Sequence, residues 1–288
     1  MPANFAASGT DNSSRISQIG LKNSPTFQVT TNRINGENLT GSYTDKLKDK
    51  ITGWGADLTG VADIESLRKL KVYPANLLEP YTRAISVAIQ LPRSVFDMIS
   101  DRPTPIYAAV YQTANRILDQ IAFRTAVTLQ MEGFNGLPIP ASQVLDQRKY
   151  YGAISHKAVA RMAGLGWQGK NLLLITPQYG SRVRLATILT DAPLITDGPV
   201  TNRCGKCMSC RDACPAEAIK GISTKDHYKN RNDALYFSQC VDKLKGEFAK
   251  IPNIGAAICG ICIKVCPFGK KVKKIRSSRK ASEYVRQR

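Results

Sequence analysis

Eight cysteines lie in one stretch near the C-terminal end of the 288-residue chain, at spacings typical of metal-cluster ligands. The first run reads C-x2-C-x2-C-x3-C-P, and the second ends in C-x2-C-x3-C-P. Runs of this kind supply thiolates to [4Fe-4S] clusters, which carry single electrons. The sequence therefore predicts two such clusters. Their expected ligands are Cys204, Cys207, Cys210, Cys214, Cys240, Cys259, Cys262 and Cys266.

The spacing also predicts how the cysteines divide between the clusters. In the two-cluster pattern, three thiolates of a run hold one cluster and the fourth crosses to the other. Cys214 therefore belongs with the second run, and Cys266 belongs with the first. The two expected ligand sets are Cys204, Cys207, Cys210 and Cys266, and Cys214, Cys240, Cys259 and Cys262.

Zinc and disulfide bonds are the competing explanations of these cysteines. Zinc also binds C-x2-C pairs, but it needs closed sets of four ligands and gives no reason for two C-x3-C-P endings. Disulfides need an oxidising compartment, and the N-terminal residues show neither an apolar export signal nor a twin-arginine pair. No apolar stretch has the length of a membrane span. We therefore expect a cytoplasmic protein with no membrane span.

The charge of the chain indicates an anionic partner. Lys and Arg number 41 against 22 Asp and Glu, which gives a net charge of +19. An acidic electron donor such as ferredoxin or flavodoxin would suit this charge, and so would a nucleic acid such as tRNA. Histidine is scarce, because only His156 and His227 occur. This scarcity excludes a His-based triad or a zinc hydrolase and favours redox chemistry.

Apolar periodicity predicts the elements that must position these groups. Residues 1–43 are rich in Ser, Thr, Asn and Gly, and we expect them to be a poorly ordered arm. Helices are expected over 44–55, 106–131 and 157–165. The predicted order of strands and helices is that of a layered α/β or α+β domain. The expected strands are 84–91, 137–139, 172–175 and 183–189.

Two long blocks carry a resemblance to a known family. AGLGW-x-GKN occupies 163–171 and ITPQYGSRVRL occupies 175–185, with LPIPASQ at 137–143 and ISHK at 154–157 ahead of them. Together with the cysteine runs, these blocks resemble the epoxyqueuosine reductase family, above all its short members. The related cobalamin-dependent reductive dehalogenases are similar as well. The resemblance covers about residues 44–270.

The resemblance implies an architecture and a cofactor. It implies a nitroreductase-like, cobalamin-binding α/β domain over 44–200, a ferredoxin-like double-cluster domain over 201–270 and a basic tail over 271–288. The clusters would relay electrons to cobalt in a reductase that acts on a small-molecule or nucleoside substrate. Glycines would let the large cofactor approach the backbone, and basic side chains would contact its polar groups. The expected cofactor contacts are Ser155, His156, Gly164, Gly166, Trp167, Gly169, Lys170, Asn171, Tyr179, Gly180, Arg182 and Arg184.

The chain departs from the family pattern at the proton donor. Epoxyqueuosine reductases proper carry an Asp in a V-D-T-G-P-L-L-E type segment, and the stretch PASQVLD here puts Pro140 in that place. They usually continue into a helical-repeat domain that helps to hold tRNA, whereas this chain stops soon after the second cysteine run. The tyrosine donor of dehalogenases maps only loosely. The candidate proton donors are His156, Tyr107, Tyr111 and Asp146, with Tyr150 and Tyr151 as further candidates.

Three functions of different classes fit these observations. The first is a cobalamin-dependent reductase fed by the two clusters. The second is an electron-transfer protein of the ferredoxin type without its own corrinoid. The third is a tRNA-binding protein whose clusters are structural or sensory. The first is favoured because the GLGWQGKN and ITPQYG blocks would have no explanation in a bare ferredoxin.

Overall fold

Four antiparallel strands form the sheet against which the helices pack. The computed structural model describes residues 39–146 and 150–269. The strand order is β1-β2-β6-β3, so the two long strands lie in the middle. Burial on both faces favours apolar residues all along these central strands. The strands are β1 (Leu58–Asp63), β2 (Arg83–Gln90), β3 (Gly136–Ile139) and β6 (Val183–Thr190).

The register of the central pair separates two cores. Ile85 lies opposite Ile188, and Ala84 lies opposite Leu189. Because side chains alternate along a strand, Ile85 and Ile188 enter one core while Ala84 and Leu189 enter the other. The sheet therefore forms the middle layer of a three-layer arrangement.

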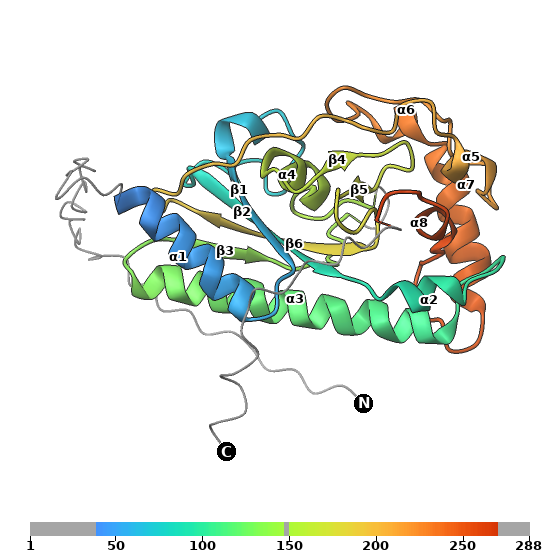
Figure 1. Ribbon diagram of the computed structural model, residues 1–288, viewed down its shortest axis with the longest axis horizontal. Coiled ribbons are helices and arrows are strands. Elements are labelled where there is room, and N and C mark those ends of the chain that lie inside the picture. Colours follow the sequence, from blue (N-terminus) through green and yellow to red (C-terminus); the bar gives the residue numbers. More distant parts are fainter. Residues whose placement is uncertain (1–38, 147–149, 270–288) are drawn as a thin grey trace, which may run out of the picture. The chain divides into compact units, whose positions relative to one another are not determined.

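Two helices cover the first face of the sheet (Figure 1). They are α1 (Leu39–Gly53) and α3 (Pro105–Met131). The hydroxyl of Thr104 accepts a hydrogen bond from the Tyr107 amide, and Pro105 occupies the first turn, so α3 has a well-defined start.

Shorter elements cover the second face. They are the 3-10 turn η1 (Ile64–Leu67), helix α4 (His156–Met162) and the hairpin of β4 (Trp167–Gln168) with β5 (Leu174–Ile175). Helix α4 contacts β1, β2 and β6, and it also contacts β4 and β5. Helix α4 is thus packed between the sheet and the hairpin.

The cysteine-bearing residues form a module of short helices. Its core side chains Ile254, Ile258 and Ile261 join the same cluster as Tyr107 of α3. The Lys264 ammonium donates hydrogen bonds to the carbonyls of Asp97 and Ile99 at the end of α2 (Arg93–Asp97). The module is therefore anchored to α2 and the start of α3. Its elements are α5 (Ser209–Asp212), α6 (Arg231–Ala234), α7 (Phe237–Asp242), the π-helical η2 (Lys243–Glu247), the 3-10 turn η3 (Phe248–Lys250) and α8 (Ile261–Lys264).

The mixed α/β fold expected from the sequence is confirmed, and so are the long helix and the buried strand before it. Residues 39–43 are helical, so the expected boundary of the arm at residue 43 is wrong, and α1 begins earlier. Residues 1–38 of the expected arm and the expected basic tail at 271–288 lie outside the described residues. The expected boundary at residue 200 between the α/β domain and the double-cluster domain stays a prediction.

A glycine in β1 tests the packing of α4 against the sheet. A Cβ at Gly60 would lie 2.0 Å from the carbonyl oxygen of Ala163, a backbone atom that cannot rotate away. We expect Gly60→Ala to lower the free energy of unfolding by about 1–3 kcal/mol. Gly53→Ala is the control because its Cβ would meet nothing within 4 Å. Anaerobic urea denaturation of both variants measures the difference, and equal midpoints would contradict this packing.

Candidate functional site

One set of four cysteines surrounds a small cavity. This cavity is also lined by Lys170, Asn171 and Phe268. Burial and the neighbouring thiols raise the pKa of Cys210 to about 11. Thiols crowded in this way need a positive centre before they can ionise together, and iron supplies one. The set is Cys204, Cys207, Cys210 and Cys266, the four cysteines predicted to share a cluster.

The other four cysteines also influence one another. Burial, followed by Cys240 and Cys214, raises the pKa of Cys259 to about 11. Burial, followed by Cys259 and Cys240, raises the pKa of Cys262 well above its ordinary value. Cys210 of the first set also raises the pKa of Cys262. The assignment of Cys214, Cys240, Cys259 and Cys262 to one cluster therefore stays a prediction.

The signature blocks of the sequence lie against the first set rather than around a large cavity. Trp167 is fully buried, and its indole N–H donates to the Cys204 sulfur at 3.4 Å. The Lys170 ammonium donates to the backbone carbonyls of Gly205 and Cys207. Arg182 donates to the Gly269 carbonyl at 2.6 Å.

Gly180 of the second block also lies against the cysteine module. A Cβ at Gly180 would meet the Phe268 carbonyl at 2.2 Å, so the glycine permits close contact with the cysteine module. Nine of the expected cofactor contacts do not line the larger cavity of about 430 Å³. They are Gly164, Gly166, Trp167, Gly169, Lys170, Asn171, Tyr179, Gly180 and Arg182.

A larger cavity of about 430 Å³ lies between the α/β part and the cysteine module. The α/β part contributes the segment 150–158 together with residues of β3, β5 and β6. The module contributes 227–229, Arg231, Phe237 and Ile263. Ile263 directly follows the cluster-ligand candidate Cys262. Of the expected cofactor contacts, Ser155, His156 and Arg184 line this cavity.

The cavity wall carries positive charge. Among the described residues that line it there is no Asp or Glu. Aromatic rings hold two of its cations in place, since the Arg231 guanidinium lies 4.1 Å from the ring centre of Tyr151 and Lys71 lies 4.8 Å from the same ring. Such a wall favours a ligand that is anionic or rich in carbonyl groups. The cations are Lys71, Lys157, Arg184, Lys229 and Arg231.

His156 has both ring nitrogens engaged within the protein. Nε2 lies 3.0 Å from the Pro140 carbonyl oxygen, which can only accept, so Nε2 carries the proton. Nδ1 then accepts from the Thr187 hydroxyl at 2.8 Å. Burial lowers the pKa of His156 to about 4. The expected role of His156 as a proton donor is therefore not supported, and the ring instead fixes the position of the Pro140 loop.

Lys157 is one of several cations in the cavity wall that were not predicted from the sequence to contact a ligand. Its side chain lies in the cavity wall and makes no hydrogen bond or ion pair with another described residue. Burial, followed by Arg231 and Arg184, lowers the pKa of Lys157 to about 8. Lys157 therefore exchanges its proton near neutral pH. A lysine at the start of a helix gives no sequence pattern that would reveal this.

The other donor candidates divide between the cavity and its surroundings. Tyr107 lines the cavity, is 4% exposed, and has its pKa raised chiefly by burial. The Tyr111 hydroxyl accepts from Arg184 at 3.2 Å and contacts the Ser142 hydroxyl, outside the cavity lining. Asp146 pairs with Tyr151 through the backbone and does not line the cavity. Of the four tyrosines considered as donors, Tyr107, Tyr150 and Tyr151 therefore line the cavity.

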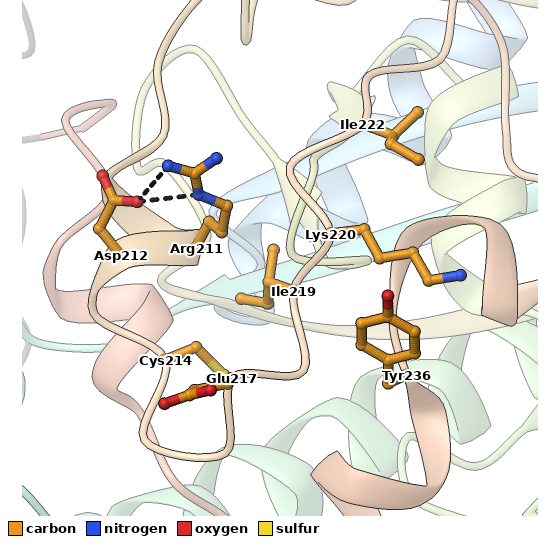
Figure 2. Close-up of a pocket in the computed structure, with 8 residues that line it drawn as sticks. All are labelled: Arg211, Asp212, Cys214, Glu217, Ile219, Lys220, Ile222 and Tyr236. Carbon is orange, nitrogen blue, oxygen red and sulfur yellow. Dashed lines mark hydrogen bonds and ion pairs between the residues drawn. The ribbon is translucent and has the colours of Figure 1, made fainter.

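An outer hollow of about 770 Å³ lies beside Cys214 (Figure 2). Its charged side chains are partly satisfied, because Arg211 pairs with Asp212 at 2.8 Å. The Lys220 ammonium lies 4.6 Å from the ring centre of the exposed Tyr236 and donates to a backbone carbonyl. No pattern in the sequence indicated this hollow.

Comparison with known proteins identifies the cysteine module. Residues 203–269 match the family model described as a 4Fe-4S double cluster binding domain. The chain is similar to the epoxyqueuosine reductase of Listeria monocytogenes, with 38% identity over 120 residues, which are 41% of this chain and 31% of that protein. The match thus spans about a third of the relative's length. The expected 4Fe-4S clusters and the resemblance to epoxyqueuosine reductases are confirmed.

Solved structures support the fold over about four fifths of the chain. An epoxyqueuosine reductase bound to a modified tRNA-Tyr stem loop covers 80% of this chain and 66% of its own, with a TM-score of 0.55 and 24% identity. A reductive dehalogenase reported in connection with B12-dependent dehalogenation covers 81% of this chain and 32% of its own, with a TM-score of 0.62 and 19% identity. No helix in the described ranges is long and apolar enough to cross a bilayer.

The burial of the neutral His156 ring makes stability depend on pH. Its pKa of about 4 in the folded protein lies below the ordinary 6.5, so the unfolded chain binds the proton more readily. The contribution of His156 to stability is therefore complete above pH 6.5 and declines as the pH falls toward 4. We expect His156→Asn to make the urea midpoint less dependent on pH between 7 and 5.

His227→Asn is the matched control for this measurement. Burial and then Arg161 also lower the pKa of His227, while the Asp226 carboxylate opposes this shift. Its removal should change the pH dependence less. An unchanged dependence in His156→Asn would show that the ring is not held neutral.

Proposed function

We propose that this protein is a cobalamin-dependent iron–sulfur reductase, in which two [4Fe-4S] clusters deliver electrons to a cofactor held in the large cavity. The observation that carries the proposal is the position of this cavity. Its wall is shared between the α/β part and the double-cluster module, and Ile263 in that wall follows Cys262 directly. Electrons would therefore pass from the second cluster into the cavity over a short path.

The lining of the cavity fits a large, amphiphilic cofactor. Cobalamin combines a planar ring, amide side chains and a nucleotide tail with a phosphate. Lys157, Lys229 and Arg231 are suited to bind the phosphate and amide oxygens. Apolar side chains such as Leu172 and Leu185 are suited to contact the ring. When bound, cobalamin supplies a metal centre that accepts single electrons and cleaves a carbon–oxygen or carbon–halogen bond reductively.

Protons for such a reduction come from the residues of the cavity. Lys157 has a pKa of about 8, so its ammonium can give up a proton near neutral pH. Tyr107 lies in the same wall, next to Cys259 and Cys262, but burial raises its pKa. Lys157 is therefore the better general acid of the two.

The proposed partners follow from charge and from the relatives. A low-potential ferredoxin or flavodoxin would supply electrons to a protein of net charge +19. The cationic cavity wall suits a nucleoside that is part of tRNA, and one structural neighbour was solved with a tRNA stem loop. A small halogenated or oxygenated molecule is the other substrate class. The proposed location is the cytoplasm.

Anaerobic reconstitution with iron, sulfide and hydroxocobalamin tests the proposal. After gel filtration we expect about eight iron atoms and one cobalt per chain, with a Co(II) signal in the EPR spectrum. Eight iron atoms without cobalt would overturn the cobalamin proposal and leave an electron carrier. Reduction of tRNA-bound or halogenated substrates by the loaded protein then separates the two substrate classes.

The cobalamin affinity of a Lys157 variant tests whether the cofactor binds in the large cavity. Lys157→Met should weaken cobalamin binding about tenfold or more, because a charge-assisted hydrogen bond contributes about 1.5–3 kcal/mol. Lys220→Met removes a lysine of the outer hollow and serves as the control with unchanged affinity. Fluorescence or absorbance titration of the iron-loaded variants gives both dissociation constants. Equal weakening in both variants would argue against the large cavity as the binding site.

A further inference from the structure

We propose that Trp167 and Lys170 raise the reduction potential of the first cluster, the one assigned to Cys204, Cys207, Cys210 and Cys266. This inference rests on the cluster assignment of the proposed function but not on cobalamin. It gives the AGLGW-x-GKN block a role as the environment of an electron carrier.

Trp167 supplies a hydrogen bond to a ligand sulfur. Its side chain is fully buried, and the Nε1–H group donates to the Cys204 Sγ at 3.4 Å. The indole packs edge-on against Phe268, with ring centres 4.8 Å apart, which fixes its orientation. Since an indole N–H can only donate, a sulfur that carries negative charge is its best acceptor here.

Lys170 supplies a buried positive charge. It is 3% exposed, and its ammonium donates to the carbonyls of Gly205 at 2.9 Å and Cys207 at 3.0 Å. The Met208 sulfur lies at 3.7 Å and completes three acceptors for three donors. Among the described residues no carboxylate forms an ion pair with Lys170. Its charge is therefore compensated only by neutral groups.

These two groups favour the reduced cluster. A [4Fe-4S] centre with four thiolates carries about −2 when oxidised and gains one further negative charge on reduction. A buried cation and an N–H donor both stabilise the more negative state, and a low local dielectric strengthens each effect. Reduction by one electron thus becomes easier when Trp167 and Lys170 are present.

The glycines of the block allow this placement. A Cβ at Gly166 would lie 2.2 Å from the Ile175 carbonyl oxygen, and a Cβ at Gly169 would lie 2.3 Å from the Ile175 Cδ1 atom. Because the Ile175 carbonyl oxygen is a backbone atom, close pairing of β4 with β5 needs glycine directly before Trp167. The pattern G-W-x-G-K follows from the hairpin that presents both side chains to the cysteines.

EPR-monitored redox titration of the iron-loaded protein with dithionite tests the inference. In Lys170→Met, the ratio of reduced to oxidised first cluster at a fixed potential should fall about tenfold, which equals 59 mV for a one-electron couple. In Trp167→Phe, the ratio should fall about threefold. Only one of the two reduction steps should move. If neither reduction step shifts in variants that retain their full iron content, the inference is overturned.

Controls separate an electrostatic effect from damage. Lys206→Met removes an exposed lysine of the same loop, whose charge is screened by water, and should leave both steps within twofold. Lys170→Arg keeps the charge and should restore most of the shift. Loss of iron in the wild-type protein would instead overturn the cluster assignment of the proposed function.

A measurement on the unmutated side chain keeps the inference testable if Trp167→Phe loses its iron. The chain has two tryptophans, Trp54 and Trp167. With ¹⁵N-labelled indole, the reduced protein should show a ¹⁵N coupling in electron spin echo spectra, and Trp54→Phe should retain it. Absence of the coupling in the reduced wild-type protein would contradict the hydrogen bond to Cys204.

Discussion

The crossing of cysteines between the two runs determines how the chain folds around the clusters. Cys266 is the last cysteine of the second run, but it lies beside the cysteines of the first run. Cys214 ends the first run and influences Cys240 and Cys259 of the second run. The chain between them must therefore fold back on itself. This return carries Ile254, Ile258 and Ile261 onto the start of α3, so the module is packed against the α/β part as well as closed internally.

The same packing creates the large cavity. One wall comes from α4 and β6, and the other comes from the segment that includes Arg231, Phe237 and Ile263. Neither part encloses the space alone. The proposed electron path and the proposed cofactor site thus adjoin each other because one interface builds both. The Trp167 hairpin strengthens this interface on the side of the first cysteine set.

Local patterns in the sequence predicted what depends on local physics. Cysteine spacing indicated the clusters, and apolar periodicity indicated α3 and β2 nearly to the residue. The roles of Gly166 and Lys170 were misjudged, because a glycine shows that backbone comes close without showing which partner comes close. The roles of His156 and Lys157 depend on Thr187, Pro140 and Arg231, which only tertiary folding brings near.

Iron content of paired cysteine variants tests the crossing most directly. Cys204→Ala combined with Cys266→Ala should destroy one cluster and leave about four iron atoms per chain, because both ligands belong to one [4Fe-4S] centre. Cys204→Ala combined with Cys214→Ala should destroy both clusters and leave almost none. If the second pair retains about four iron atoms and the first pair retains none, each run holds its own cluster and the crossed arrangement is wrong.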